Sequence, residues 1–425
     1  MKVLHVIQRY WPYTGGSERH LQEISERLVR DGLRVTVLTT DALDLELFWD
    51  PRKERVRILA ESHNGVEIRR FRVRHLPGGP LAFGAVRRST PVLAHLPLAG
   101  RLIARRLARL TPWVPDLARA LARLDDDYAL IHGMNICFES LLLPALAAAR
   151  QRHIPFVVTP LIHLGESPRS IVRRYYTMPH QIELIARADA VLAQTPIEVD
   201  YLVQRGVDPR RIVLAGVGVN PTDVLGGQGH RFRAAHELTA PLVSYIGTAA
   251  YDKGTVHLVE AMRRLWAHGS DAELILAGPM LDAFRSYLAS LPPGDRRRIH
   301  ALGMIPEAEK RDLLDATAVV AMPSRTDSFG IVYLEGWLYQ KPVIGARAGG
   351  VPAVITDGVD GFLVEFGDVT ALAERIERLL RDPALARAMG ARGRAKVLER
   401  YTWDRIYPTV RAVYERLGAR ALRRP

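Results

Sequence analysis

The chain has 425 residues, a length that suits two globular domains of about 200 residues each. Of these residues 48% are hydrophobic and 25% charged, a balance that excludes a disordered protein. Because Cys137 is the single cysteine, a disulfide framework and a cysteine-rich zinc site are both excluded, and its apolar surroundings favour a small core residue. The formal net charge of +13 leaves nucleic acid, an anionic membrane or anionic small molecules as partners, and the positions of the arginines matter more than their number.

The first half of the chain alternates short β-branched runs with longer helical patterns. The first run, at residues 3–7, is expected to be a strand and not a signal peptide, because no small-residue cleavage site follows it. The longest apolar run, around residues 141–149, is far shorter than the ~20 residues of a spanning helix. We therefore expect a cytoplasmic protein with at most peripheral membrane contact. Further strands are predicted at residues 35–39, 66–71, 129–132, 156–159, 190–194 and 212–214.

Residues 96–124 interrupt this alternation and predict a basic amphipathic helix. One interpretation is a packed surface helix with a solvated arginine face, a second is docking on anionic lipid, and a third is a phosphate-rich partner. Leucines fall at helical spacing at positions 98, 102, 107 and 110, and Arg101, Arg105 and Arg109 repeat every four residues on another face.

The run Asp125-Asp-Asp127 satisfies an Asp-x-Asp pattern that metal-dependent transferases of another fold use. Here it is expected to end a helix, so a solvated run of charge is the favoured interpretation and no metal site is predicted. A Walker loop, a Gly-x-Ser-x-Gly elbow and a nucleic-acid-binding signature are all absent from the sequence. Nucleic acid is therefore not an expected partner.

A glycine-rich, poorly periodic stretch at residues 216–240 separates the two halves. Two successive series of strands and helices predict two doubly wound α/β domains with parallel sheets, at residues 1–218 and 219–401. The cleft between two such domains is the default ligand site. Strands of the second series are predicted at residues 242–246, 272–277, 299–303, 318–322, 342–346 and 361–364.

The most informative stretch runs from Pro323 to Trp337. A loop carrying Asp327 follows a strand, and the helix opened by Gly330 contains Glu335; free N–H groups at the start of that helix favour a phosphate. The two carboxylates are eight residues apart, up to ~12 Å on a helix, which is too far to flank one scissile bond as glycosidase carboxylates do. The spacing suits a long ligand held at both ends. In the alternative interpretation, Asp327 or Ser328 is only a helix cap.

With these motifs in this order, the chain resembles the retaining glycosyltransferases of family 4, which have the GT-B fold. Asp327-x7-Glu335 corresponds to the family's Glu-x7-Glu signature, and it is followed by Lys341-Pro-Val-Ile-Gly345 and Ala348-Gly-Gly-Val-Pro352. The resemblance extends to Gly15-Gly-Ser-Glu-Arg-His20 and to residues 245–254, and it covers essentially the whole chain.

The resemblance implies that two Rossmann-like domains face each other, the first binding the acceptor and the second the donor, with a helix over residues 402–425 packing back on the first. It implies that Glu335 binds the donor ribose, that Asp327 lies by the donor sugar and that Lys253 binds the diphosphate. It places Gly15 and Gly16 near the donor phosphates and the acceptor, while a plain tight turn is the alternative for this glycine pair. The sequence itself favours Ser17 as the cap of the helix that follows. Main-chain amides of the donor site would come from Phe329, Gly330, Ile331 and Val332, and Ser328 is a further donor-binding candidate.

Two positions depart from the family pattern. A phosphate-binding arginine usually follows the glycine matched by Gly247, but this chain has Thr248 there, and Asp327 is one methylene shorter than the usual glutamate. Arg325 and Arg347 are candidates for the missing cation.

Two histidines follow predicted strand ends of the first domain, His132 and His163. In the family, a histidine in one of these loops contacts the donor hexose, which makes both candidates for the catalytic site. A structural hydrogen-bonding role is the alternative for each.

The expected function is transfer of a hexose-type sugar from a nucleoside diphosphate sugar to a glycan, a lipid-linked or a small-molecule acceptor, with no cofactor and no metal. Two alternatives keep the fold. One is a sugar phosphorylase or nucleotide-sugar epimerase, and the other is a nucleotide-sugar-binding protein without catalysis, which Thr248 and Asp327 motivate.

Overall fold

The computed structural model describes residues 1–13, 15–124 and 127–422, so Asp125 and Asp126 of the acidic run lie outside the described residues. The chain forms two compact units. Unit 1 consists of Met1–Ile162, Arg173–Gly216 and the chain from Tyr407, and unit 2 consists of His163–Val172 and Val217–Ile406.

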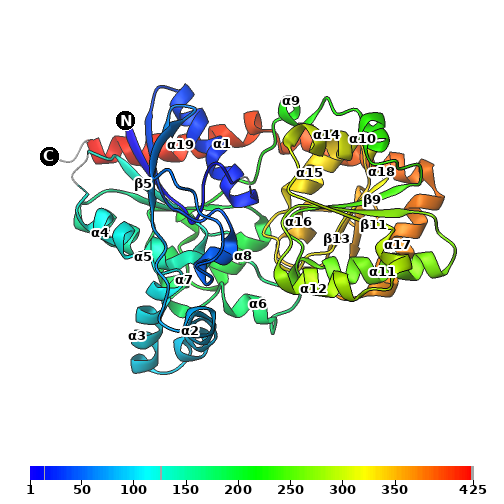
Figure 1. The fold of residues 1–425 in the computed structure, drawn as a ribbon. Helices are drawn as coiled ribbons and strands as arrows, with labels where there is room; N and C mark the ends of the chain where they lie inside the picture. Colours follow the sequence, from blue (N-terminus) through cyan, green and yellow to red (C-terminus); the bar gives the residue numbers. More distant parts are fainter. Residues whose placement is uncertain (14, 125–126, 423–425) are drawn as a thin grey trace. The chain divides into compact units, whose positions relative to one another are not determined.

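Unit 1 is built on a sheet of eight described strands in the order β3-β4-β2-β1-β5-β6-β7-β8 (Figure 1). All neighbours in it are parallel except β3 and β4, which are antiparallel. Buried strands with helices on both faces require continuous apolar runs, and the central strands have them. The strands are β1 Lys2–Val6, β2 Arg34–Thr40, β3 Ala60–His63, β4 Val66–Phe71, β5 Leu130–Met134, β6 Phe156–Thr159, β7 Ala190–Ala193 and β8 Ile212–Leu214.

The helices of unit 1 connect these strands and cover the sheet. They are α1 Gly16–Arg30, α2 Gly79–Ala94, α3 Leu98–Leu107, α4 Pro115–Ala122, α5 Glu139–Gln151, α7 Pro179–Ala186 and α8 Pro196–Gln204, with α6 Ile171–Arg174 at the boundary with unit 2. Single turns of 3-10 helix are η1 Leu45–Phe48, η2 Ala108–Leu110, η3 Ile136–Phe138 and η4 Pro209–Arg211.

Helix α19 (Trp403–Leu422) returns the end of the chain to unit 1, where its Tyr414 is fully buried. The Tyr414 hydroxyl lies 2.6 Å from Nδ1 of His132 and 3.1 Å from Nε2 of His5. His5 also contacts Ser25 at 2.8 Å, which links α1 to the same cluster. Both histidines are wholly buried, and burial lowers the pKa of each, to about 3 for His5.

Unit 2 has a parallel sheet of six described strands in the order β11-β10-β9-β12-β13-β14. The prediction of two Rossmann-like domains with doubly wound parallel sheets is confirmed. The strands are β9 Leu242–Ile246, β10 Glu273–Ala277, β11 Ile299–Gly303, β12 Val319–Met322, β13 Val343–Ala346 and β14 Gly361–Val364. The helices are η5 Tyr251–Lys253, α9 Pro221–Val224, α10 Gly229–Ala235, α11 Thr255–Ala267, α12 Asp282–Ser290, α13 Pro293–Arg296, α14 Glu307–Ala316, α15 Ile331–Leu338, α16 Val351–Val354, α17 Val369–Arg381 and α18 Pro383–Arg400.

The single amphipathic helix predicted over residues 96–124 is wrong. Helix α3 ends at Leu107, a 3-10 turn follows, and α4 begins at Pro115. Pro112 lacks the backbone N–H that a continuing helix needs. Within α3, Leu98 and Leu102 are 82% and 61% exposed, so they do not pack against the unit. Among the described residues, no helix has the length and apolar content needed to cross a membrane.

Candidate active site

The order of the unit 2 strands reverses between β9 and β12, which are neighbours in the sheet but distant in sequence. Ligands of doubly wound sheets bind beyond the carboxyl ends of the strands at such a reversal. The segment after β9 contains Lys253, and the segment after β12 runs from Pro323 to Gly330. The fold therefore brings the two most informative motifs to one place within unit 2.

Lys253 and Asp327 form an ion pair at this reversal. The Lys253 ammonium donates hydrogen bonds to Oδ1 of Asp327 at 2.5 Å and to the carbonyl oxygen of Thr326 at 3.0 Å. Burial acts to raise the pKa of Asp327, but the charge and hydrogen bond of Lys253 outweigh it and lower that pKa. The carboxyl group is therefore ionised at neutral pH.

His163 lies beside this ion pair, in the short segment of residues 163–172 that belongs to unit 2. Burial, followed by the positive charge of Lys253, lowers its pKa to about 3, so the imidazole is neutral at physiological pH. The segment is joined to the rest of the unit by a hydrogen bond from the Gly349 amide to the Gly165 carbonyl, 2.9 Å long.

Helix α15 begins directly after this loop, and Gly330 is its N-terminal cap. Gly330 has φ +90°, and a Cβ there would collide with the ring of Tyr333, so glycine is the residue that this turn accepts. The first N–H groups of a helix have no partner within the helix, and in α15 these include the amides of Ile331 and Val332. Phe329 is buried against Tyr401, and Ser328 is half-buried.

Glu335 lies on the second turn of α15 and is 8% exposed. Its Oε1 accepts a hydrogen bond of 2.7 Å from Lys310 of α14. Its Oε2 is buried and has no hydrogen-bond partner among the described residues. A buried carboxylate oxygen without a partner is costly, so a ligand with hydroxyl groups would be favoured here. Lys310 was not predicted.

The two arginines considered for the cation missing at Thr248 are both engaged by carboxylates. Arg325 lies between Asp252 at 2.6 Å and Glu166 at 3.3 Å. Arg347 forms ion pairs with Asp357 and Glu365. Thr248 itself is half-buried after Gly247, and its carbonyl accepts a hydrogen bond of 2.8 Å from Tyr245.

His132 does not lie in a loop, and that prediction is wrong. Strand β5 continues to Met134, so His132 is inside the sheet and wholly buried. One ring nitrogen contacts Tyr414 and the other contacts Thr159 at 2.8 Å. Both nitrogens are therefore used in the core of unit 1.

Gly15 and Gly16 lie at the start of α1 in unit 1, Gly15 as the cap and Gly16 as the first residue. The prediction that Ser17 caps this helix is wrong, since its hydroxyl donates to Glu18 at 2.8 Å. A Cβ at Gly15 would lie 2.5 Å from the ring of Tyr13 and 2.6 Å from the carboxylate of Glu18, so a larger residue would force these side chains to shift.

The predicted site residues thus fall into two sets. Lys253, Asp327 and His163 are together in unit 2, with Glu335 on the helix that follows. Gly15, Gly16 and His132 belong to unit 1. No group of three or more potential metal ligands was found among the residues that the structure describes.

Two family models match the chain. Residues 15–218 match the sequence model of the glycosyl transferase 4-like domain, and residues 228–396 match that of the glycosyl transferases group 1. The chain belongs to the group 1 glycosyltransferases of family 4. These two matches place the Lys253 and Glu335 motifs inside the group 1 domain.

The curated relatives of this glycosyltransferase match it over about half of its length. It is 27% identical over 254 residues to an alpha-maltose-1-phosphate synthase of Mycolicibacterium smegmatis, covering 55% of this chain and 65% of the relative. It is 30% identical over 254 residues to a D-inositol 3-phosphate glycosyltransferase of Xylanimonas cellulosilytica, covering 55% of this chain and 58% of the relative. The chain therefore spans less than two thirds of each relative.

Solved structures extend the similarity to the whole glycosyltransferase. The Anabaena protein HepE in complex with UDP and glucose superposes with a TM-score of 0.72 at 21% identity, covering 98% of this chain and 100% of that one. The fold is GT-B, as the resemblance implied.

Proposed function

We propose that this glycosyltransferase moves a hexose-type sugar from a nucleoside diphosphate donor to an acceptor and retains the anomeric configuration. The observation that carries the proposal is the buried, unpartnered Oε2 of Glu335, on a helix whose amino end follows the Lys253–Asp327 pair. A nucleotide sugar has hydroxyl groups at both ends and negative charge between them, which matches this order of groups.

In the proposed complex, the ribose hydroxyls donate hydrogen bonds to Glu335. The diphosphate accepts hydrogen bonds from the first amides of α15 and from the Lys253 ammonium. The ionised Asp327 accepts hydrogen bonds from the hydroxyls of the donor sugar, and the neutral His163 lies beside it. Unit 2 would thus hold the donor, and unit 1 the acceptor.

The proposed reaction breaks the bond between the anomeric carbon and the β-phosphate oxygen. The acceptor oxygen bonds to that carbon on the face that the diphosphate leaves, and the acceptor proton passes to the departing phosphate oxygen. Lys253 and the α15 amides stabilise the negative charge that develops on the diphosphate. Because they supply positive charge, we propose that transfer needs no metal ion, and EDTA should leave the rate unchanged.

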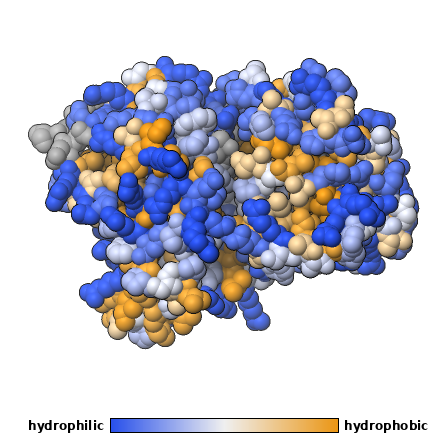
Figure 2. Space-filling view, in the orientation of Figure 1, coloured by the Kyte–Doolittle hydropathy of each residue, from blue (hydrophilic) through white to orange (hydrophobic). Residues whose placement is uncertain are grey.

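We also propose peripheral contact with an anionic membrane through the α2–α3 hairpin, residues 79–107. Figure 1 shows the two helices side by side, and Figure 2 shows apolar side chains gathered on them. Arg101 is exposed on α3, Arg109 is exposed on the 3-10 turn η2 that follows the hairpin, and Arg105 pairs weakly with Glu183 at 3.7 Å. Exposed leucines with arginines beside them suit a bilayer surface. The large apolar side chains exposed here are Leu81, Val92, Leu96, Leu98, Leu102 and Ile103.

A two-step experiment tests the proposed transfer. A thermal-shift screen against UDP-, GDP- and ADP-hexoses first identifies the donor by the largest rise in Tm. NMR of the reaction with and without candidate acceptors then follows the anomeric proton, and an axial donor should give an axial product. A new sugar formed without acceptor would indicate an epimerase, and a requirement for inorganic phosphate would indicate a phosphorylase. Stabilisation by a donor without any turnover would favour the non-catalytic alternative.

A further inference from the structure

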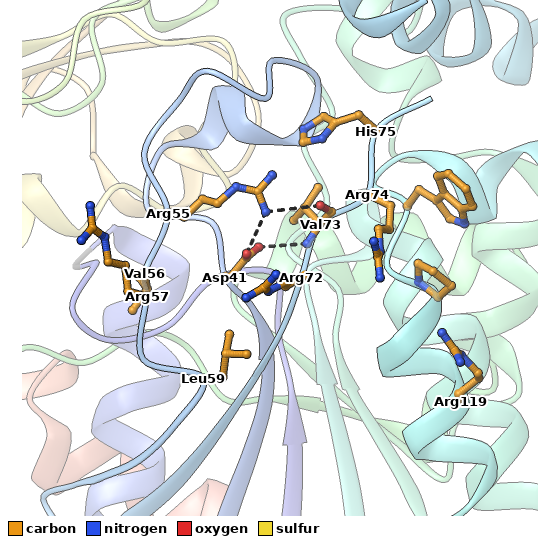
Figure 3. A pocket seen from close by; sticks show the side chains of 12 residues that line it. Asp41, Arg55, Val56, Arg57, Leu59, Arg72, Val73, Arg74, His75 and Arg119 are labelled. Atoms are coloured by element: carbon orange, nitrogen blue, oxygen red, sulfur yellow. Dashed lines mark hydrogen bonds and ion pairs between the residues drawn. The ribbon is translucent and has the colours of Figure 1, made fainter. Parts of the chain in front are cut away.

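Unit 1 contains a large cavity that none of the proposed donor residues line. Its volume is about 1040 Å³, and it lies beyond the carboxyl ends of β2 and β4 (Figure 3). This is the edge of a parallel sheet at which ligands bind. The lining residues are Asp41, Arg55, Val56, Arg57, Leu59, Arg72, Val73, Arg74, His75, Trp113, Pro115 and Arg119. We call it the arginine cavity.

Asp41 holds the two sides of the arginine cavity together. It follows β2, and its carboxylate accepts hydrogen bonds of 2.9 Å from the Val73 amide, just after β4, and from Arg55. The side chain of Asp41 is almost wholly buried. The segment after β4 is fixed again where the Arg74 amide donates to the Trp113 carbonyl at 2.8 Å. The walls are therefore built by buried polar contacts.

The charge of the cavity is strongly unbalanced. Five guanidinium groups line it, against the carboxylate of Asp41 and that of Asp116, which pairs with Arg74 at 3.6 Å and also with Arg119. Arg57 and Arg72 are exposed and form no ion pair with any carboxylate among the described residues. In Figure 3 the guanidinium groups of Arg55, Arg72 and Arg74 lie around the middle of the view.

The cavity also has an apolar part. Trp113, Pro115, Leu59 and Val56 are among the residues that line it. An indole ring presents an apolar face to the less polar part of a ligand. Together with the arginines, which suit planar, bidentate contacts to phosphate oxygens, this combination fits a phosphate group attached to an organic body.

We propose that the arginine cavity binds a phosphate-bearing ligand, with Arg72, in the middle of the cavity, as the principal contact of the phosphate and Arg57, at its edge, as a second positive charge. We propose that this ligand is the acceptor of the transfer reaction, and that part of the proposal rests on the proposed function. Binding of a phosphate group in the cavity does not depend on the proposed function. The phosphate can belong to a soluble sugar phosphate or to a lipid headgroup, and the cavity adjoins the hairpin at both ends, since His75 precedes α2 and Trp113 follows η2.

Calorimetric titration with inorganic pyrophosphate tests the cavity separately from the donor site. Pyrophosphate should bind both sites, so the background is Lys253→Ala, which weakens the donor site. In that background, Arg57→Gln with Arg72→Gln should weaken pyrophosphate binding about tenfold or more, since charged hydrogen bonds contribute at least that much. Arg123→Gln, an exposed arginine outside the cavity, is the matched control and should change nothing.

Unchanged affinity in the Arg57→Gln, Arg72→Gln variant would overturn the proposal, provided that its Tm matches that of the control. If Lys253→Ala, compared with the wild type, does not weaken pyrophosphate binding, that result would count against the donor site and not against the arginine cavity. Flotation with phosphatidylcholine vesicles that contain phosphatidic acid separates the two sources. If the wild type binds these vesicles and the Arg57→Gln, Arg72→Gln variant does not, the ligand is a lipid headgroup. If the wild type binds pyrophosphate but not the vesicles, the ligand is a soluble phosphate.

Discussion

Two lysines of unit 2 form ion pairs that look alike but have different surroundings. Lys253 pairs with Asp327 at the reversal of the sheet and is partly open to solvent. Lys396 pairs with the buried Asp360 and also donates to the Thr356 hydroxyl at 2.9 Å, so it joins α18 to the segment before β14. Of these two, Lys253 lies at the reversal of the sheet, where we propose that the diphosphate binds.

Lys253→Ala should reduce transfer by about a hundred- to thousandfold, the usual effect of removing one charge-stabilising donor. Lys396→Ala is the matched control, because it breaks an ion pair of the same kind in the same unit. It should lower the Tm and leave the rate per folded molecule unchanged. Initial rates and melting curves of both variants check this, and near-normal turnover in Lys253→Ala would remove that residue from the site.

Glu335→Gln should raise the KM for the donor about ten- to hundredfold, because a charged hydrogen bond to the ribose is lost. The preference for the donor over its 2′-deoxy analogue should shrink in the same variant. Glu307→Gln is the control, since Glu307 is the exposed second partner of Lys310. If the wild type and Glu335→Gln prefer the donor over its 2′-deoxy analogue to the same degree, the ribose does not bind at Glu335.

The sequence was sufficient to single out Lys253, Asp327 and Glu335, because their motifs are local and each follows or opens a predictable element. Lys310 could not be found in this way, since it lies on another helix and meets Glu335 only after folding. The arginine cavity was hidden for the same reason. Its arginines come from three separate stretches, at 55–57, 72–74 and 119, that only the sheet brings together.

At the scale of elements, buried parallel strands were predictable because both of their faces are apolar. Strand β3 was missed because it is a polar edge strand, Ala60–His63, which has no buried face to mark it. A strand was correctly predicted around His132, but the predicted strand ended at residue 132 and the observed one ends at Met134. The prediction stopped early because a histidine and a glycine interrupt the apolar run.

The α2–α3 hairpin gives a prediction at this scale. Leu98→Ser with Leu102→Ser should weaken binding to vesicles containing phosphatidylglycerol at least about tenfold, since each buried leucine contributes roughly 1.5–3 kcal/mol. Leu214→Ser, at an exposed leucine of β8, is the control. Binding should also fall with salt. Vesicle flotation that does not distinguish the two variants would contradict membrane contact.

At the scale of the molecule, unit 1 contains three wholly buried histidines with lowered pKa values. Burial is the main cause, and it brings the pKa to about 3 for His5 and about 4 for His20, with His132 also well below its usual value. On unfolding they return toward 6.5, so the unfolded chain binds more protons below that pH. Glu198, whose pKa burial raises to about 7, opposes this effect between about pH 7 and 4.5.

The free energy of unfolding of unit 1 should therefore fall as the pH falls below about 6.5. It should fall by about 1.4 kcal/mol per pH unit for each proton that the unfolded chain binds in excess of the folded one. The loss should steepen below about pH 4.5, where Glu198 no longer opposes it, and should continue toward pH 3. Urea unfolding followed between pH 7 and pH 4 checks this. A free energy of unfolding that does not change over this range would contradict the account.

The position of Tyr414 has a consequence for how the protein is made. A ribosome delivers His5 and His132 409 and 282 residues before Tyr414, yet these three side chains share one buried cluster. Until helix α19 emerges, the growing chain lacks the phenol that both imidazoles contact. Unit 1 can therefore complete its interior only after residue 414 has been made, and nascent chains halted before residue 414 should remain open to protease in that unit.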